Sequence, residues 1–315
     1  MINAFSYQLI IIPTYQPSLM FIQQLINGLT LGSIYALIAL GYTMVYGVLL
    51  MINFAHSEIF MIGAYIGLWA LTAIPAFASF TITGFIITFL VVLLFSGLLA
   101  VSVEKLAYKP LRQAPRLSPL ISAIGVSIVL QNLIMLFVSN QSMPLPEFKT
   151  TRYQIFSAEV DTLQIFIFCF SIALMLLLNL FISKTKFGKA MRATAHSHSV
   201  SQLMGINSSS MIAMVFFIGG ALGGIAGMLN GMYYGSIKYN MGFFPGIKAF
   251  TAAVLGGIGN VKGAMLGGFL LGLIETFSAG YISSQNKDVI TFCVLILMLV
   301  FKPTGILGEN VTEKV

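Results

Sequence analysis

Two acidic residues stand out because they lie in stretches that otherwise carry no charge. Glu58 belongs to NFAHSE (53–58), beside Asn53 and His56, and Glu275 belongs to GLIETF (272–277). A carboxylate at mid-bilayer costs about 2.5–3.5 kcal/mol on insertion scales, so both acids are candidates for a functional pathway. The structural alternative for Glu58 is an acid in the first turn of a helix that Asn53 or Ser57 caps. For Glu275 we expect a hydrogen bond inside a helix bundle rather than contact with lipid.

Few other residues have the types and spacing that catalytic or metal chemistry needs. His196 and His198 have no Cys, Asp or Glu nearby, so we expect no metal site there. No G-x-x-x-x-G-K-[ST] phosphate loop occurs, and the surroundings of Gly188 and Lys189 do not fit that pattern. No Ser/His/Asp or flavin-binding arrangement is visible. The sequence therefore predicts a chain that is not an enzyme and has no catalytic residue or cofactor of its own.

The composition indicates that lipid is the solvent for most of the chain. Of 315 residues, 58% are hydrophobic and 8% are charged, and the mean hydropathy is +0.95. Soluble domains typically carry about 25% charged residues. Residues 1–57 and 59–103 contain no Lys, Arg, Asp or Glu, and a membrane helix needs about 20 apolar residues. Continuous apolar runs such as 165–182 indicate helices, because the strands of a β-barrel alternate apolar and polar residues.

These runs predict a single domain over residues 1–315 that is all-α, a polytopic membrane helix bundle of about 8–9 spans with Gly-rich helix seams. The expected spans cover residues 21–48, 54–74, 80–103, 118–139, 162–183, 210–235, 244–258, 262–282 and 288–302. The stretch 244–258 is short, so it either spans the membrane or re-enters it. Residues 140–161 form the longest polar connection.

The basic residues set the expected orientation, because cytoplasmic loops are enriched in Lys and Arg. The loops after the third and fifth spans should be cytoplasmic, since they carry Lys105, Lys109, Arg112 and Arg116, and Lys184, Lys186, Lys189 and Arg192. The loop 140–161 should be external, since Lys149 and Arg152 are balanced there by Glu147, Glu159 and Asp161. The N-terminus should then be outside and the C-terminus inside.

Three further points follow from the placement of charges. Lys238 and Lys248 fall on the external side, against the rule. The net charge of +7 reflects loops beside membrane spans, so we expect no nucleic-acid partner. The N-terminus lacks the basic region of a cleavable signal peptide, and we expect the first span to stay as an anchor.

Glycines recur every four residues in one expected span, at Gly219, Gly223, Gly227, Gly231 and Gly235. Such spacing puts small residues on one helix face, which in lipid marks a helix–helix seam. The seam is either tight packing within the chain or a sliding or dimerising surface along a pathway. Gly256, Gly257 and Gly259 predict a helix break, which is either a plain turn or one of the broken helices that surround transporter sites.

The segment 184–210 is the most informative of the expected cytoplasmic stretches. Lys186, Lys189 and Arg192 are spaced to share one helix face, and Gly205 is typical of a helix end. Ser208–Ser210 can cap the span that follows. A short helix here would either dock onto a partner or lie as a basic loop on anionic lipid.

Several segments together closely resemble the permease subunits of branched-chain amino-acid ABC importers of the high-affinity Leu/Ile/Val type. They are NGLTLGSIYALIALGYTMVYGVLLMINFAHSEIFMIGAY (27–65), EKLAYKPLR (104–112), LISAIGVSIVLQN (120–132), MGIN (204–207), GIKAFTAAVLGGIG (246–259) and KPTGILG (302–308). They run in order along nearly the whole chain. The related urea-importer permeases share the pattern, but the segment GYTMVYG (41–47) reads differently in that family.

The resemblance implies a multi-pass protein of the bacterial inner membrane. Its partners would be membrane lipid, a homologous second permease, two cytoplasmic ATPase subunits that use ATP, and a periplasmic binding protein. Such permeases carry a coupling helix that docks on the ATPase, which the resemblance puts within about 186–207. The positions that match the pattern there are Gly188, Arg192, Ala195 and Gly205, whereas His196 and Ser197 stand where family members commonly have acidic residues.

The implied function is ATP-driven import of branched-chain amino acids by alternating access. Transport of urea or short amides by the same fold is an alternative, and a stand-alone secondary transporter is a weaker one. The latter would need intramembrane ionisable residues for ion coupling, and two isolated acids give little support.

Overall fold

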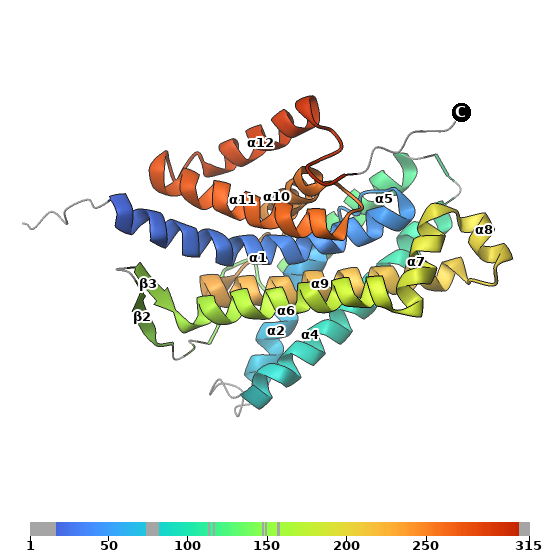
Figure 1. The fold of residues 1–315 in the computed structure, drawn as a ribbon. Coiled ribbons are helices and arrows are strands. Elements are labelled where there is room, and N and C mark those ends of the chain that lie inside the picture. The colour runs from blue at the N-terminus through green and yellow to red at the C-terminus, as the bar shows by residue number, and fades with distance from the viewer. Residues whose placement is uncertain are drawn as a thin grey trace, which may run out of the picture.

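The structure, a computed structural model, describes residues 17–73, 82–112, 114–115, 117–146, 148, 150–155 and 158–308. Its helices form one elongated bundle (Figure 1). They are α1 (Pro17–Leu49), α2 (His56–Ala73), α4 (Ile82–Val103), η1 (Glu104–Tyr108), η2 (Lys109–Leu111), α5 (Leu117–Phe137), α6 (Thr162–Lys184), α7 (Lys186–His196), α8 (His198–Leu203), α9 (Ser208–Tyr234), α10 (Phe243–Gly256), α11 (Val261–Tyr281) and α12 (Lys287–Phe301). The loop residues Arg116, Glu147 and Lys149 lie outside the described residues.

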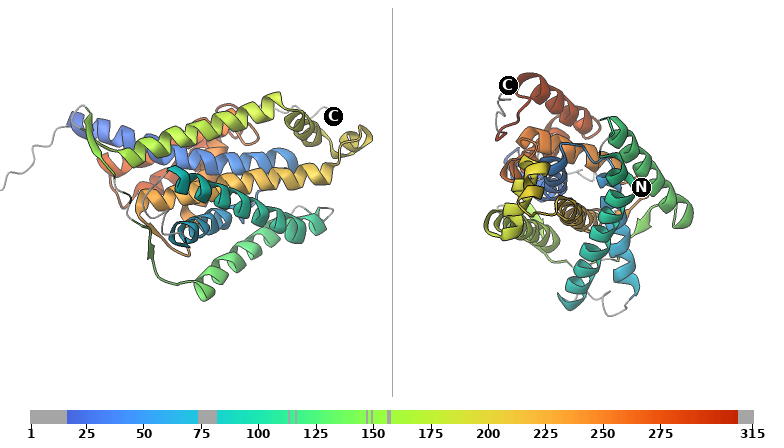
Figure 2. Two further views of the ribbon diagram at one scale, coloured as in Figure 1. Left: turned by 90° about the horizontal axis from the view of Figure 1, so that it is seen from below. Right: turned by 90° about the vertical axis from the view of Figure 1, so that its right-hand side faces the viewer.

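Helix α1 forms the centre of the bundle. It packs against α11, α9, α10 and α6, and nearly all of its side chains from Leu31 to Val48 are buried. The long helices α1, α6, α9 and α11 lie side by side, whereas α2 crosses them steeply (Figures 1 and 2). The apolar residues on the outside of α4, α5, α6 and α12 are largely exposed, as expected of helices that face lipid.

Two short antiparallel ribbons depart from the all-α expectation. Strand β2 (Arg152–Ile155) pairs with β3 (Ala158–Asp161), and β1 (Met143–Pro144) pairs with β4 (Ser236–Ile237). Asp161 then caps α6 in a capping box with Gln164, which fixes where that helix begins. The loop 140–161 satisfies part of its backbone by pairing with itself and part by pairing with residues 236–237, a solution that helical periodicity does not reveal.

The bundle has two distinct ends. The hairpin end holds the start of α1, the ribbon β2–β3 and the end of α9. Gln23 of α1 contacts Glu159 of β3, Gln164 of α6 contacts Asn27 of α1, and Tyr233 of α9 lines a hollow beside them. The α8 end holds α7, α8, the start of α9 and the residues that follow α12. The start of α1 and the loop 140–161 therefore share one end, and α12 finishes at the other.

Helix lengths support a polytopic membrane protein. Six helical segments of the described chain are long and apolar enough to cross a bilayer: α1, α4 continued through η1 and η2, α5, α6, α9 and α11. Helix α10 has 14 residues. At 1.5 Å per residue it covers about 21 Å, less than the roughly 30 Å of a hydrocarbon core.

Residues 302–308 close the α8 end after α12. The backbone N–H groups of Ile306 and Leu307 donate to the carbonyls of Leu255 and Gly256, the last residues of α10. The Asn260 side chain caps α11 and also donates to the carbonyl of Leu307. Gly257 has a φ of 108°, a conformation that favours glycine, and lets the chain turn from α10 into α11.

Candidate functional site

The segment between α1 and α2 folds back into the bundle, so that α2 begins in its interior. The imidazole of His56, the first residue of α2, lies against Gly41 of α1 and Gly223 near the middle of α9. A Cβ on either glycine would overlap the ring. The ring also stacks edge-on against Tyr42, with 4.7 Å between centroids. The glycines at positions 41 and 223 thus make room for a buried histidine.

The first turn of α10 meets the first turn of α2 at this level. Gly242, which precedes α10, approaches the backbone of Ser57, and a Cβ on Gly246 would overlap the Ser57 side chain. From there α2 runs toward β4, and α10 runs toward residues 302–308. Two helix N-termini therefore meet inside the bundle, an arrangement that broken helices use to build transporter sites.

Glu58 lies at this meeting point and is 1% exposed. Its Oε1 accepts a hydrogen bond of 3.1 Å from the hydroxyl of Ser127 on α5, and lies 3.5 Å from the Ser57 hydroxyl. Its Oε2 has no hydrogen-bond partner within the described chain, and no ion pair to Glu58 is found there. A Cβ on Gly242 would lie 3.3 Å from this oxygen.

Asn53 and Ser57 do not cap α2, contrary to expectation. The Asn53 Oδ1 accepts a 2.7 Å hydrogen bond from the hydroxyl of Tyr108, and the Ser57 hydroxyl donates to the carbonyl of Phe54. Tyr108 ends the π-helix η1, whose wider turn aims this residue into the bundle. The Asn53 side chain is therefore occupied by a tertiary contact and the Ser57 side chain by the local turn, and sequence spacing reveals neither.

Glu275 is the centre of a buried charge network. Its Oε1 lies 2.7 Å from the Nζ of Lys248 and 3.3 Å from that of Lys287, and its Oε2 accepts a 2.8 Å hydrogen bond from Tyr35. Lys248 also lies 2.6 Å from Asp288. The network joins α1, α10, α11 and α12. Charges in a low-dielectric interior need such partners, and here two acids balance two bases.

The network explains the position of Lys248, which the charge pattern of the loops does not. Lys248 does not lie in an external loop; it is 4% exposed inside α10. The signal that could have found it is a lone lysine in an otherwise uncharged apolar stretch, since an intramembrane charge requires a partner. Its partner Glu275 is 27 residues away, a separation that local patterns do not reveal.

The expected cytoplasmic helix is a pair of helices, α7 and α8, with a break at Ser197. Ser197 ends α7 and caps α8, and Gly205 has a φ of 80° just after α8. Asn207, rather than Ser208–Ser210, caps the following helix α9 through its contact with the Ser210 amide. The serines were the wrong choice because the capping residue must stand before the first helical residue.

Helix α7 is fixed against the end of α6. Gly188 is buried, and a Cβ there would overlap the carbonyl of Ile182. The Arg192 guanidinium donates to that same carbonyl, one of the free acceptors at the end of a helix. Ala195 is half-buried and His196 is exposed. Of these positions, Gly188 and Arg192 hold α7 in place and His196 faces outward.

Helix α8 presents an apolar surface at the end of the bundle. Val200, Leu203 and Met204 are 57%, 87% and 77% exposed. We call these three residues the α8 patch. Large apolar side chains that gather at one exposed place indicate an interaction site.

The glycine ridge of α9 faces its neighbouring helices. Gly219 lies beside the backbone of Gly41, Gly227 lies against the carbonyl of Phe60 on α2, and Gly231 lies against Ile237. With Gly223 against His56, this ridge allows α1 and α2 to approach α9 closely.

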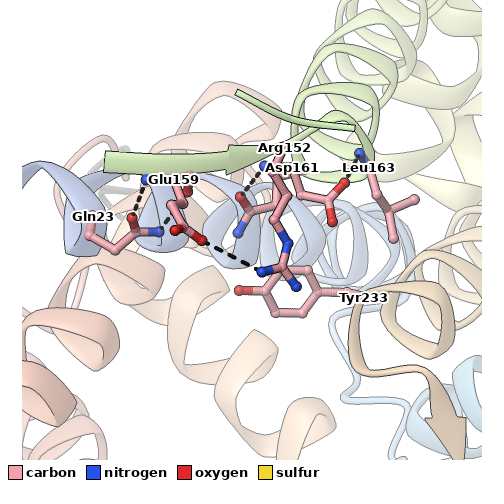
Figure 3. A pocket seen from close by; sticks show the side chains of 7 residues that line it. Gln23, Arg152, Glu159, Asp161, Leu163 and Tyr233 are labelled. Carbon is pink, nitrogen blue, oxygen red and sulfur yellow. Dashed lines mark hydrogen bonds and ion pairs between the residues drawn. The ribbon is translucent and has the colours of Figure 1, made fainter. Parts of the chain in front are cut away.

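An open hollow of about 580 Å³ lies at the hairpin end (Figure 3). Gln23 holds the edge of β3 there through two hydrogen bonds to the backbone of Glu159, and Arg152 pairs with the Glu159 carboxylate at 3.6 Å. Tyr233 forms part of the wall, as Figure 3 shows. The side chains of Arg152 and Glu159 are 76% and 62% exposed, so their pair contributes little to stability.

Comparisons with known proteins identify the family. The model of the family described as "Branched-chain amino acid transport system / permease component" matches residues 24–299. The high-affinity branched-chain amino acid transport system permease protein BraD of Pseudomonas aeruginosa is 47% identical, over 94% of this chain and 98% of that protein. The permease proteins LivH of Escherichia coli K12 and of Salmonella typhimurium are each 44% identical with the same coverage. No solved structure matches the chain. The resemblance expected from the motifs is confirmed, and the chain belongs to the family of branched-chain amino acid transport permease components.

Proposed function

We propose that this chain is the transmembrane permease subunit of an ATP-driven, binding-protein-dependent importer of branched-chain amino acids. Near-full-length similarity to permeases named for that substrate class supports this function and does not favour the urea alternative. The chain provides a passage and a mechanical link, while ATP is used by separate ATPase subunits. In this proposal the chain is not an enzyme and binds no cofactor.

The observation that carries the proposal is the α8 patch on a firmly held helix pair. Its three side chains are exposed at the end of the bundle, where the segment 184–210 was expected to be cytoplasmic. Arg192 and Gly188 tie α7 to α6, so a force applied at α8 is passed to the bundle. We therefore assign α7 and α8, together with Gly205, to docking on the ATPase.

A route from the α8 patch to the interior supports the same assignment. A hollow of about 680 Å³ lies between α8 and the α1–α2 segment, lined among others by His198, Gln202, Leu50 and Arg112. Motion of α8 toward this hollow would reach the segment that leads to His56 and Glu58. In this proposal, α8 moves against the α1–α2 segment, and this motion changes the packing at the point where α2 and α10 meet.

The orientation and the partners belong to the same proposal. The hairpin end is periplasmic and the α8 end is cytoplasmic, with the N-terminus outside and the C-terminus inside. Nine passages of the bacterial inner membrane result when α2, α10 and α12, each with the residues that lead into it, count as one crossing apiece beside the six long segments. The partners are lipid, a homologous second permease, the ATPase subunits and a periplasmic binding protein that docks at the hairpin end.

The remaining candidate residues have three roles in this proposal. Asn53, His56 and Glu58 form the interior junction of the pathway, whereas Glu275 anchors the helices around it. The ridge Gly219, Gly223, Gly227 and Gly231 is a packing seam within the chain, supported by its contacts with α1 and α2.

The test is uptake of radiolabelled leucine into vesicles that contain the chain with its second permease, ATPase subunits and binding protein. We expect uptake that requires ATP, and Leu203→Glu should reduce it at least tenfold because a charge is placed in the apolar docking surface. Ser199→Glu is the matched control, since it adds the same charge at an exposed position of α8 that belongs neither to the α8 patch nor to the hollow. Leucine uptake by this chain without the ATPase subunits, or normal uptake by Leu203→Glu, would contradict the proposal.

A further inference from the structure

The buried carboxylate of Glu58 is incompletely satisfied. One oxygen accepts from Ser127, and the other has no partner within the described chain although Glu58 is 1% exposed. A buried acceptor left unpaired costs about 1–3 kcal/mol, and more when it is charged. Native proteins rarely keep such a group unless a water, an ion or a ligand completes it.

The surroundings of the Glu58 carboxylate define the chemistry of the missing partner. Glu58 has no ion pair in the described residues, and the hydroxyls of Ser57 and Ser127 lie beside Oε1, the other oxygen of the same carboxylate. Each hydroxyl already donates a hydrogen bond, to Phe54 and to Glu58, and keeps lone pairs for accepting another. Three acceptors around one negative charge match the three N–H donors of an ammonium group.

An apolar surface begins one residue after Gly242, whose backbone lies against Ser57. Phe243 and Phe244 follow Gly242 directly in the first turn of α10, and their rings are edge-to-face with centroids 5.5 Å apart. They are 54% and 52% exposed, so both rings have a free side. Exposed aromatic rings on the helix that covers Glu58 can receive the apolar group of a ligand whose ammonium is bound there once that cover opens.

We propose that Glu58, with Ser57 and Ser127, binds the ammonium group of the amino acid in transit, and that Phe243 and Phe244 contact its side chain. The inference rests on the proposed function and adds a substrate subsite to it. In the present conformation α5 and the start of α10 cover Glu58. Helix α5 is the element best suited to open, because only Pro119, Ala123 and Ile134 of that helix are buried.

The test uses the complete transporter in lipid nanodiscs, without the binding protein, and measures retention of radiolabelled L-leucine. Two competitors separate the ends of the substrate: 3-methylbutylamine keeps the ammonium and the branched chain, and 4-methylpentanoate keeps the carboxylate instead. We expect the amine to compete at least tenfold better than the acid. Glu58→Gln should weaken leucine binding at least tenfold and remove the preference for the amine.

Further variants keep the test decisive if Glu58→Gln does not assemble. Ser127→Ala should weaken leucine binding severalfold. The control is Ser122→Ala on the same helix, whose hydroxyl donates to the carbonyl of Ala107, and it should leave leucine binding unchanged. Phe244→Ala should reduce the preference for leucine over alanine. Unchanged affinity and unchanged amine preference in Ser127→Ala and Glu58→Gln would overturn the inference, as would the absence of leucine retention by the parent complex. ATP-dependent uptake by the parent, measured separately, shows whether the proposed function itself holds.

Discussion

The charge network around Glu275 allows a quantitative test of how the bundle tolerates buried charge. Losing one partner of a buried ion pair costs about 3–5 kcal/mol when the remaining charge has no substitute. Lys248→Met leaves Glu275 with Lys287 at 3.3 Å and Tyr35 at 2.8 Å, so we expect a smaller cost of about 2 kcal/mol. Lys287 is 35% exposed, and Lys287→Met should cost about 0.5 kcal/mol.

The double variant removes both cations and leaves only Tyr35 at the Glu275 carboxylate. We expect it to cost about 4 kcal/mol, more than the sum of the single variants, because each lysine substitutes for the other. The assay is thermal unfolding of the purified protein in detergent, where about 1 kcal/mol corresponds to roughly 2–4 °C.

The matched control is Lys262→Met, the same change at an exposed lysine of α11, which should shift stability by less than about 0.5 kcal/mol. Two results would refute the reasoning. One is strict additivity of the two single variants, which would mean that the lysines do not share Glu275. The other is a Lys248→Met variant as stable as the control, which would mean that the carboxylate needs no cation.

Three further predictions concern single contacts inside the bundle and the glycine that follows α8. Tyr108→Phe leaves the Asn53 Oδ1 without its donor and should cost about 1–3 kcal/mol in thermal unfolding, whereas Asn53→Leu combined with it should recover part of the loss. Gly223→Ala pushes a Cβ into the His56 ring and should cost about 1–3 kcal/mol; stability equal to the parent would show that the ring moves freely. Gly205→Ala meets no neighbouring atom but keeps a φ of 80°, so it should cost about 1 kcal/mol locally and speed amide hydrogen exchange in α8 about fivefold, with the rest of the chain unaffected.

The helices were predictable because lipid imposes a simple requirement. An uncharged apolar run has to satisfy its backbone internally, so it forms a helix. The expected spans at 162–183 and 262–282 therefore agree closely with α6 and α11. The family was predictable as well, since its motifs are distributed along almost the whole chain and the family match covers residues 24–299.

The interior was not predictable because its contacts join residues far apart in sequence. The hydroxyl of Tyr108 occupies the oxygen of Asn53 across 55 positions, which removes the expected helix cap. Lys248 reaches Glu275 across 27 positions, and this buried partner explains a lysine in an apolar stretch. Single-sequence patterns identified Glu58 and Glu275 as unusual, but only the fold separates an acid with two cations from an acid with an unpaired oxygen.

The contact between residues 302–308 and α10 has a consequence for biosynthesis. Ile306 and Leu307 supply the donors for the carbonyls of Leu255 and Gly256, and these residues are translated after every helix of the described chain. Until they are translated, the carbonyls at the end of α10 lack these two donors. Assembly of this part of the protein is therefore completed only after translation has passed α12, and a nascent chain stalled before Ile306 would leave the end of α10 without this contact.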